Sequence, residues 1–187
     1  MHFAHFPRIA SIFEHVSGVA HGFGQSGGGP SRSTVMIGSL LAIEDVLLDV
    51  VSGSKVDLID EIGKHVESVH EMMRGSVAPA LLHRERIGST ALGHGVALPH
   101  ARVTGLERIL PMYLRLKTAI PFDAPDGGLV TDVLVLLVPK VATQEHLDVL
   151  AQASQMLSDA SFRERLHECK LPLEAKRLFE HWPKLPA

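Results

Sequence analysis

Residues 130–138 constrain the fold more than any other stretch, because nearly every side chain in them is apolar. The run reads Val-Thr-Asp-Val-Leu-Val-Leu-Leu-Val, follows a segment rich in proline, glycine and aspartate at 118–128, and ends before Pro139. A short apolar run between turn signals, rich in β-branched residues, is typical of a strand that is buried on both faces. We therefore predict a sheet with residues 130–138 at its centre and a loop over residues 118–128.

Residues 110–116 alternate between two sets of side chains. Leucine and methionine occupy positions 110, 112, 114 and 116, whereas Pro111, Tyr113 and Arg115 stand between them. This period of two predicts a strand with one buried face. Residues 95–98 predict another, shorter strand that ends before Pro99.

The segment that follows Ser54 has a clear helical pattern. Ser54 with Asp57 supplies an N-cap, and the apolar residues recur with helical spacing, at Leu58, Ile59, Ile62, Val66 and Met73. A shorter helix is predicted over residues 77–84, with Ser76 at its start and Pro79 in its first turn.

Three more helices are predicted nearer the C-terminus. Thr143 is placed to cap the first, whose inward stripe is predicted to be Leu147, Leu150, Ala151, Ser154 and Leu157. Ser161 and Glu164 are expected to form a capping box for the second, and the last runs through residues 178–182. Helices interleaved with strands predict an α/β fold, a mixed β-sheet with helices on both faces.

The first 35 residues differ in composition from the rest of the chain. Residues 22–33 are mainly glycine and serine, a composition typical of a flexible linker. We expect residues 1–35 to form a flexible tail, or a translated leader before an internal start at Met36, and residues 36–187 to form one folded domain. A chain of 187 residues is long enough to bury a core without disulfides or metal ions.

Charge and cysteine content narrow the function classes. The formal net charge is −3, which argues against a general nucleic-acid surface. Cys169 is the single cysteine, so the chain has no internal disulfide and no thiolate pair for a metal, as fits a reducing cytoplasm. The longest uninterrupted apolar run, residues 133–138, is far too short to span a membrane. We therefore expect a cytoplasmic protein without membrane insertion or nucleic-acid binding.

Residues 88–102 carry the strongest chemical signal. They read Gly-Ser-Thr-Ala-Leu-Gly-His-Gly-Val-Ala-Leu-Pro-His-Ala-Arg and place His100 directly after a proline. Because Pro99 fixes its own backbone while Gly93 and Gly95 permit tight turns, we expect the His100 imidazole to be held on a stiff, exposed edge. Imidazole is largely uncharged at neutral pH, which suits it to accept a phosphoryl group on one nitrogen while the other donates to a fixed acceptor, such as a nearby carbonyl.

The same run resembles the active-site signature of the enzyme IIA components of the bacterial phosphoenolpyruvate-dependent phosphotransferase system, of the fructose, mannitol and nitrogen-regulatory type. Residues 82–90 resemble the Arg-Glu helix end and Gly-Ser-Thr turn of that family, and residues 137–139 and 144–147 resemble its apolar strand, proline and second histidine. The resemblance implies that His100 carries the phosphoryl group, that His146 is the second active-site histidine, and that Arg84 is the active-site arginine.

Plainer interpretations of these three residues stay open. They are a hydrogen-bonded structural histidine at 100, a histidine that only covers the first turn of its helix at 146, and a solvated arginine at 84 that pairs with a neighbour such as Glu85. Arg102 suits the positive rim of a site and an ordinary surface position equally well. For Ser89 and Thr90 a turn-stabilising role is favoured over contact with a phosphate.

Four histidines raise the alternative of a zinc site in a metal-dependent hydrolase: His83, His94, His100 and His146. No familiar ligand spacing connects them, and His94 and His100 are six residues apart across a glycine turn and a strand. The glycine-rich run also lacks the Gly-Lys-Ser/Thr ending of a nucleotide-binding P-loop and precedes a strand. We therefore expect neither a metal nor an organic cofactor.

The resemblance implies a phosphoryl carrier that receives the group on His100 from a histidine-containing phosphocarrier protein, of the general HPr-like or the nitrogen type. Residues 87–100 and 118–126 are most similar to the nitrogen-regulatory members, and no IIB, IIC or carrier domain is attached. We therefore expect a phosphorylation switch that binds regulatory target proteins. The alternative within the family is a sugar-specific enzyme IIA that passes the group to a IIB domain.

Overall fold

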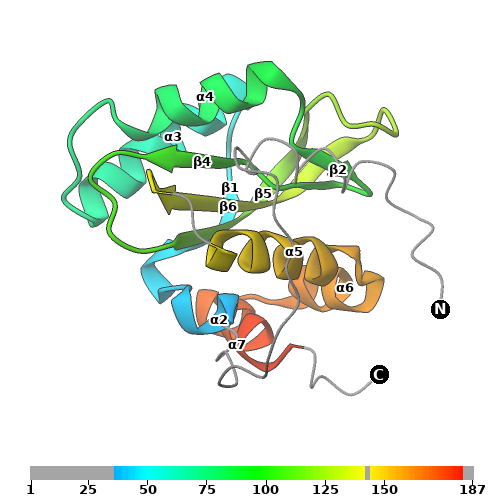
Figure 1. Ribbon diagram of the computed structural model, residues 1–187. Coiled ribbons are helices and arrows are strands. Elements are labelled where there is room, and N and C mark those ends of the chain that lie inside the picture. The colour runs from blue at the N-terminus through cyan, green and yellow to red at the C-terminus, as the bar shows by residue number, and fades with distance from the viewer. Residues whose placement is uncertain (1–35, 142–143, 183–187) are drawn as a thin grey trace, which may run out of the picture.

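The chain folds as a sandwich in which helices cover both faces of one β-sheet (Figure 1). The computed structural model describes residues 36–141 and 144–182. The sheet has six strands: β1 (Val46–Val50), β2 (Ala91–Gly93), β3 (Val96–Ala97), β4 (His100–Val103), β5 (Leu110–Pro121) and β6 (Leu129–Pro139). This architecture confirms the predicted α/β fold.

Strand β6 lies at the centre of the sheet, as predicted. It pairs antiparallel with β5 on one side and parallel with β3 and β4 on the other, and the strand order is β1-β5-β6-β3-β2 with β4 also bonded to β6. Residues 132–138 are all buried. The carboxylate of Asp132 is tolerated there because it accepts hydrogen bonds from the Tyr113 hydroxyl at 2.6 Å and the Thr131 hydroxyl at 2.9 Å.

Strand β5 differs from the prediction in length and burial. It continues to Pro121, so the loop before β6 starts after residue 121 and not at residue 118. Both of its faces are buried over residues 110–116, because helices also cover the face that carries Tyr113 and Arg115. Arg115 Nη1 donates to the carbonyl oxygens of Leu166 at 3.0 Å and Cys169 at 2.8 Å. A long side chain that reaches a helix end in this way can be buried without losing its hydrogen bonds.

The helices divide between the two faces of the sheet (Figure 1). Helices α3 (Lys55–Val69) and α4 (Val77–Ile87) cover one face. Helices α2 (Ile37–Leu40), α5 (Gln144–Ser158), α6 (Ala160–Glu168) and α7 (Pro172–His181) cover the other, and a 3-10 turn, η1 (Ile43–Asp45), leads into β1. Within the described ranges no helix has both the length and the apolar content that a membrane crossing needs.

Helices α3 and α4 begin where the sequence predicts, but only α3 has the expected cap. The Ser54 hydroxyl accepts from the backbone N–H of Asp57 at 3.2 Å, which confirms the predicted N-cap of α3. The Ser76 side chain does not cap α4. Glu67 replaces it by accepting from the N–H groups of Ser76 at 2.9 Å and Val77 at 3.1 Å. Helix α4 also runs three residues beyond the predicted end at residue 84.

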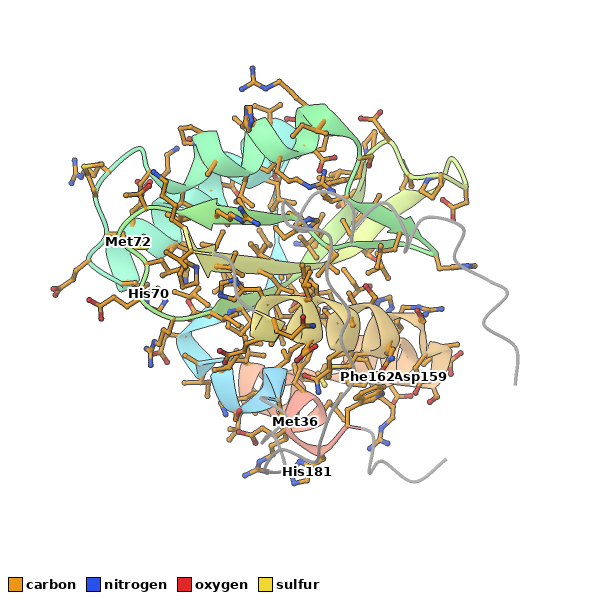
Figure 2. All side chains as sticks on the ribbon, viewed as in Figure 1. Met36, His70, Met72, Asp159, Phe162 and His181 are labelled. Carbon is orange, nitrogen blue, oxygen red and sulfur yellow. The ribbon has the colours of Figure 1, made fainter. Side chains whose placement is uncertain are left out.

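The C-terminal helices depart from the predictions at their starts. Asp159, and not Ser161, caps α6, since its carboxylate accepts from the N–H groups of Ser161 at 3.0 Å and Phe162 at 3.3 Å; Figure 2 labels Asp159 and Phe162 at this end of the helix. Helix α7 starts at Pro172, six residues before the predicted segment. The predicted cap of α5, Thr143, and the predicted tail at residues 1–35 lie outside the described residues.

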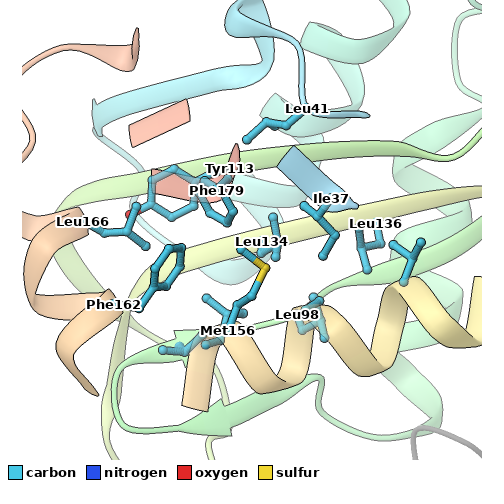
Figure 3. Packing of buried hydrophobic residues seen from close by; sticks show 14 of the residues in the cluster. Ile37, Leu41, Leu98, Tyr113, Leu134, Leu136, Met156, Phe162, Leu166 and Phe179 are labelled. Carbon is cyan, nitrogen blue, oxygen red and sulfur yellow. The ribbon is translucent and has the colours of Figure 1, made fainter. Parts of the chain in front are cut away.

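The inward stripe of α5 is only partly as predicted. Leu150, Ser154 and Leu157 are buried, whereas Leu147 and Ala151 are half-buried. Val149, Ala153 and Met156 are buried instead. The stripe lies between α2, α6 and the sheet. In the same core the ring of Phe179 packs against those of Tyr113 and Phe162, with a centroid distance of 5.2 Å in each pair (Figure 3). A second apolar core fills the space between α3, α4 and the opposite face of the sheet.

Candidate functional site

A cavity of about 560 Å³ lies between α4, β4, the end of β6 and the first turns of α5. Two arginines and three histidines form its polar lining: Arg84, Arg102, His83, His100 and His146. Its apolar lining consists of Pro79, Ala80, Ile87, Ala101, Val138 and Leu150. Among the described residues that line it, none is acidic, so the cavity favours an anion.

His100 is the first residue of β4, and both of its ring nitrogens have defined partners. Nδ1 lies 2.9 Å from the carbonyl oxygen of Leu98, which can only accept, so Nδ1 carries the ring proton. Arg84 Nε can only donate and lies 3.1 Å from His100 Nε2. Nε2 therefore holds the lone pair, and the neutral ring is fixed as one tautomer with Nε2 toward the cavity.

The His100 side chain is buried. The sequence predicted an exposed edge at this position, and that prediction is wrong. Only 6% of the residue is accessible. The parallel pairing of β4 with β6 sets His100 beside Leu136, inside the sheet, and the flanking helices α4 and α5 supply the cavity walls. His100 consequently lines a shaped pocket and does not face open solvent.

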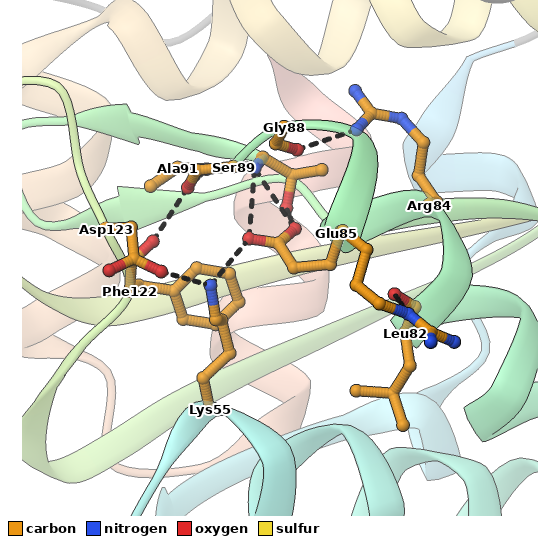
Figure 4. Close-up of polar contacts among 11 residues, drawn as sticks. Lys55, Leu82, Arg84, Glu85, Gly88, Ser89, Ala91, Phe122 and Asp123 are labelled. Carbon is orange, nitrogen blue, oxygen red and sulfur yellow. Dashed lines mark hydrogen bonds and ion pairs between the residues drawn. The ribbon is translucent and has the colours of Figure 1, made fainter.

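Arg84 lies in the last turns of α4, where it reaches the cavity and the following turn at the same time. Its Nη1 donates to the carbonyl oxygen of Gly88 at 2.8 Å (Figure 4). Its Nε donates to His100 Nε2 at the same time. Burial lowers the pKa of the Arg84 guanidinium, and the charge of Glu85 opposes that shift. A guanidinium keeps its positive charge at neutral pH even so, which places a fixed cation beside the lone pair of His100.

His146 is the third residue of α5 and lines the cavity from the wall opposite α4. Only 3% of the residue is accessible. Burial lowers the pKa of the His146 imidazole; Glu145 opposes that shift and Arg102 adds to it. A neutral imidazole at the start of a helix can donate an N–H to an anion that the helix dipole also attracts.

The structure thus brings together the three residues that the sequence singled out, Arg84, His100 and His146, and adds His83 and Arg102 to the same cavity. His94 is elsewhere, in the turn between β2 and β3, where its backbone N–H donates to Asp126 at 2.7 Å. Over the described ranges, no group of three or more His, Cys, Asp or Glu side chains is arranged to hold a metal ion.

The residues of the Gly88–Thr90 turn contact protein groups. Ser89 Oγ donates to the carbonyl oxygen of Phe122 at 2.7 Å, and Thr90 Oγ1 donates to Glu85 Oε2 at 2.6 Å. Both side chains stabilise the turn, which is the role that the sequence favoured for them.

Glu85 is the residue that sequence reasoning missed. The sequence suggests only a surface partner of Arg84 at this position, yet Glu85 is buried and accepts from Thr90 and Lys55. A helical pattern points to this position, since Val77, Leu81 and Glu85 follow at intervals of four and share the buried face of α4.

Comparison with known proteins agrees with this geometry. Residues 39–182 match the family described as "Phosphoenolpyruvate-dependent sugar phosphotransferase system, EIIA 2". A nitrogen regulatory protein from Pseudomonas aeruginosa is 39% identical over 121 residues, which are 64% of this chain and 79% of that protein.

Solved structures show the same relationship. The nitrogen regulatory protein IIA-Ntr from Neisseria meningitidis superposes with a TM-score of 0.72 at 37% identity, covering 76% of this chain and 98% of that one. One chain in the structure of the complex of enzyme IIAMTL and phosphorylated enzyme IIBMTL from Escherichia coli shares the fold. It superposes with a TM-score of 0.63 at 20% identity, over 75% of this chain and 99% of that one. The chain therefore belongs to the EIIA 2 family of the phosphoenolpyruvate-dependent sugar phosphotransferase system.

Proposed function

We propose that this chain is a phosphoryl carrier that accepts the group on His100 Nε2 and acts as a phosphorylation switch of the nitrogen-regulatory type. The observation that carries the proposal is the fixed tautomer of His100. The Leu98 carbonyl holds the Nδ1 proton, so the lone pair is on the nitrogen that faces the cavity. A nucleophile that is neutral, oriented and backed by a fixed acceptor meets the requirement for attack on phosphorus.

The donor is the phosphohistidine of a small histidine-containing carrier protein. Nε2 of His100 attacks the phosphorus, a new N–P bond forms, and the N–P bond of the donor breaks with its electron pair returning to the donor imidazole. The Nδ1 proton stays on His100, and the Leu98 carbonyl stabilises the positive charge that the ring acquires. Donor and acceptor are both imidazoles, so the protein supplies alignment and charge stabilisation without a metal or organic cofactor.

Arg84 has to change its hydrogen-bond acceptor during this step. Its Nε–H donates to the lone pair that attacks, so that hydrogen bond transfers to a phosphoryl oxygen as the new bond forms. His146 donates its N–H to another oxygen, and Arg102 adds positive charge at the rim. Catalysis of phosphoryl transfer consists mainly of such electrostatic stabilisation and positioning.

The surroundings of the cavity fit a protein as donor. Pro79, Ala80 and Ile87 on α4, together with Val138 and Leu150, give the cavity apolar walls around the charged centre. A surface that combines apolar area with a few charges suits a protein partner, since the apolar area is buried on docking and the charges orient the encounter. The relatives at 39% and 37% identity carry the nitrogen-regulatory name, which supports regulatory targets as the readers of the phosphorylated state. Sugar-specific transfer to a IIB domain is the alternative, and the family description includes it.

The test is phosphorylation by radiolabelled phosphoenolpyruvate, an enzyme I-type kinase and a phosphocarrier protein. We expect one phosphoryl group per chain, on a bond that is stable in alkali and lost in acid, and no labelling of His100→Ala. Labelling of His100→Ala at the wild-type level would overturn the proposal.

A further inference from the structure

A buried carboxylate fastens the turn that follows α4. Glu85 is only 8% accessible and Thr90 only 3%. Glu85 Oε2 accepts from the Thr90 hydroxyl at 2.6 Å and from the Thr90 backbone N–H at 3.1 Å, which closes a ring from α4 to the residue before β2 (Figure 4). Hydrogen bonds to a buried charged acceptor are stronger than those between neutral groups.

Two further residues, Lys55 and Ser89, hold the same ring against its neighbours. Lys55, at the start of α3, donates to Glu85 Oε1 at 3.1 Å and to Asp123 at 2.6 Å, and its ammonium group lies 5.1 Å from the centre of the Phe122 ring. Ser89 Oγ donates to the Phe122 carbonyl at 2.7 Å. The Gly88–Thr90 turn is therefore fixed both to α3 and to the end of β5.

This turn contacts the active-site arginine directly. Gly88 is enclosed by the ring between Glu85 and Thr90, and its carbonyl oxygen accepts from Arg84 Nη1 at 2.8 Å. The same guanidinium contacts His100 through Nε. A shift of the Gly88 carbonyl thus changes where Arg84 points, although neither Glu85 nor Thr90 is among the residues that line the cavity.

From this chain of contacts we infer that Glu85 and Thr90 are positioning residues for phosphoryl transfer, acting on Arg84 through the Gly88 carbonyl. The inference rests on the proposed function, since it concerns the same transfer to His100. It assigns to the buried Glu85–Thr90 pair a role beyond stability: the pair sets the angle at which the guanidinium meets the incoming phosphoryl group. Misplacement of a charged group by about 1 Å can slow such a step by about 100-fold.

The experiment uses substitutions that alter a single hydroxyl in the full-length chain. Thr90→Val removes the 2.6 Å hydrogen bond to Glu85, and Thr90→Ser retains it. Thr131→Val is a matched control, because it removes a hydroxyl that donates at 2.9 Å to another buried carboxylate, Asp132, outside the cavity. The probe is a phosphorylated histidine-containing carrier protein, mixed with each variant in a rapid-quench apparatus.

We expect Thr90→Val to lower the maximal transfer rate between about 10-fold and about 100-fold, with the carrier concentration at half-maximal rate unchanged. Thr90→Ser should restore the rate, and Thr131→Val should leave it at the wild-type value whatever its effect on melting temperature. A ¹⁵N NMR spectrum adds a readout that lost stability alone would not move: the His100 Nε2 resonance should shift toward that of a free pyridine-type nitrogen in Thr90→Val only.

The outcomes separate this inference from the function on which it rests. If the wild-type chain accepts no phosphoryl group, the proposed function fails. If the wild type accepts it and folded Thr90→Val transfers at the wild-type rate, the positioning role is wrong while the function stands. An equal loss of rate in Thr131→Val would also overturn the positioning role, since it would assign the effect to general loosening of the fold.

Discussion

Arg84 Nε donates a hydrogen bond to His100 Nε2 across 3.1 Å, so the cation of the site is bound to the lone pair that would attack. The contact keeps the acceptor nitrogen unprotonated and pointed at the cavity before a donor arrives. In the proposed transfer, the arginine is therefore already next to the nitrogen that receives the phosphoryl group. The effect of substituting Arg84 should therefore be on transfer and not on folding.

Arg84→Ala should fold normally and accept the phosphoryl group between about 100-fold and about 1,000-fold more slowly, the usual effect of losing one donor at a developing charge. Rapid-quench measurement of transfer from the phosphocarrier checks the rate. Arg86→Ala is the matched control, because Arg86 is exposed, contacts the Leu82 carbonyl at 3.3 Å and does not line the cavity. Equal rates for Arg84→Ala and wild type would remove the arginine from the site.

His146→Ala should also slow transfer without becoming the attachment point, because its N–H is proposed to contact the phosphoryl group and not to bond covalently with it. Peptide mapping of phosphorylated wild type under alkaline conditions should recover the label on the peptide with His100. Recovery on the peptide with His146 would contradict the assignment of both histidines.

The stability of the fold should depend on pH through His146. Burial lowers the pKa of this histidine in the folded chain, whereas the pKa of a histidine in an unfolded chain is about 6.5. As the pH falls below about 6.5, the unfolded chain therefore binds the proton first, and stability is lost. Between about pH 7 and about pH 5.5 the melting temperature of wild type should fall more steeply than that of His146→Gln. Parallel pH profiles would show that His146 does not contribute.

Removal of residues 1–35 should leave both the melting temperature and phosphoryl acceptance nearly unchanged. The family match begins at residue 39, and the glycine- and serine-rich composition of residues 22–33 gives this segment little to pack against the domain. Calorimetry and the labelling assay on the truncated chain check this. A large drop in melting temperature would show that the first 35 residues dock on the domain.

The regulatory role predicts that phosphorylation exchanges binding partners. A phosphoryl group on His100 adds between about −1.5 and −2 charges to the cavity, so a partner that buries this face has to desolvate or pair the new charge. Pull-downs with wild type and His100→Ala, with and without a phosphoryl donor, should recover different proteins that are not sugar transporters. Loss of uptake of one sugar on deletion of the gene, with rapid discharge of the phosphorylated chain by a IIB domain, would favour the sugar-specific role.

Local pattern was sufficient to predict the central strand and the Ser54 cap, and it pointed to His100. Arg84 and His146 could be predicted only from the family resemblance. The two residues are separated by 61 residues of chain, and only the folded sheet brings them together. Alternation could not predict that the face of β5 with Tyr113 and Arg115 is buried. Its burial depends on helices α6 and α7, which come later in the chain.

The helix starts show a second limit of local reasoning. Asp159 and Ser161 are both good capping residues two positions apart, and which of them caps α6 depends on where the turn after α5 ends. Glu67 caps α4 from the preceding helix, a contact between two elements that neither element's own sequence encodes. The charge of Glu85 suggests a surface residue, whereas its helical spacing from Val77 and Leu81 places it on the buried face of α4.

The acceptor of the His100 Nδ1 proton belongs to the main chain. Every amino acid at position 98 carries a carbonyl oxygen, so no single replacement there deletes the group that selects the tautomer. The roles proposed for Arg84 and His146, in contrast, depend on side chains that one codon change removes. Sequence drift in descendants of this chain should therefore alter how fast the phosphoryl group arrives much more readily than which nitrogen receives it.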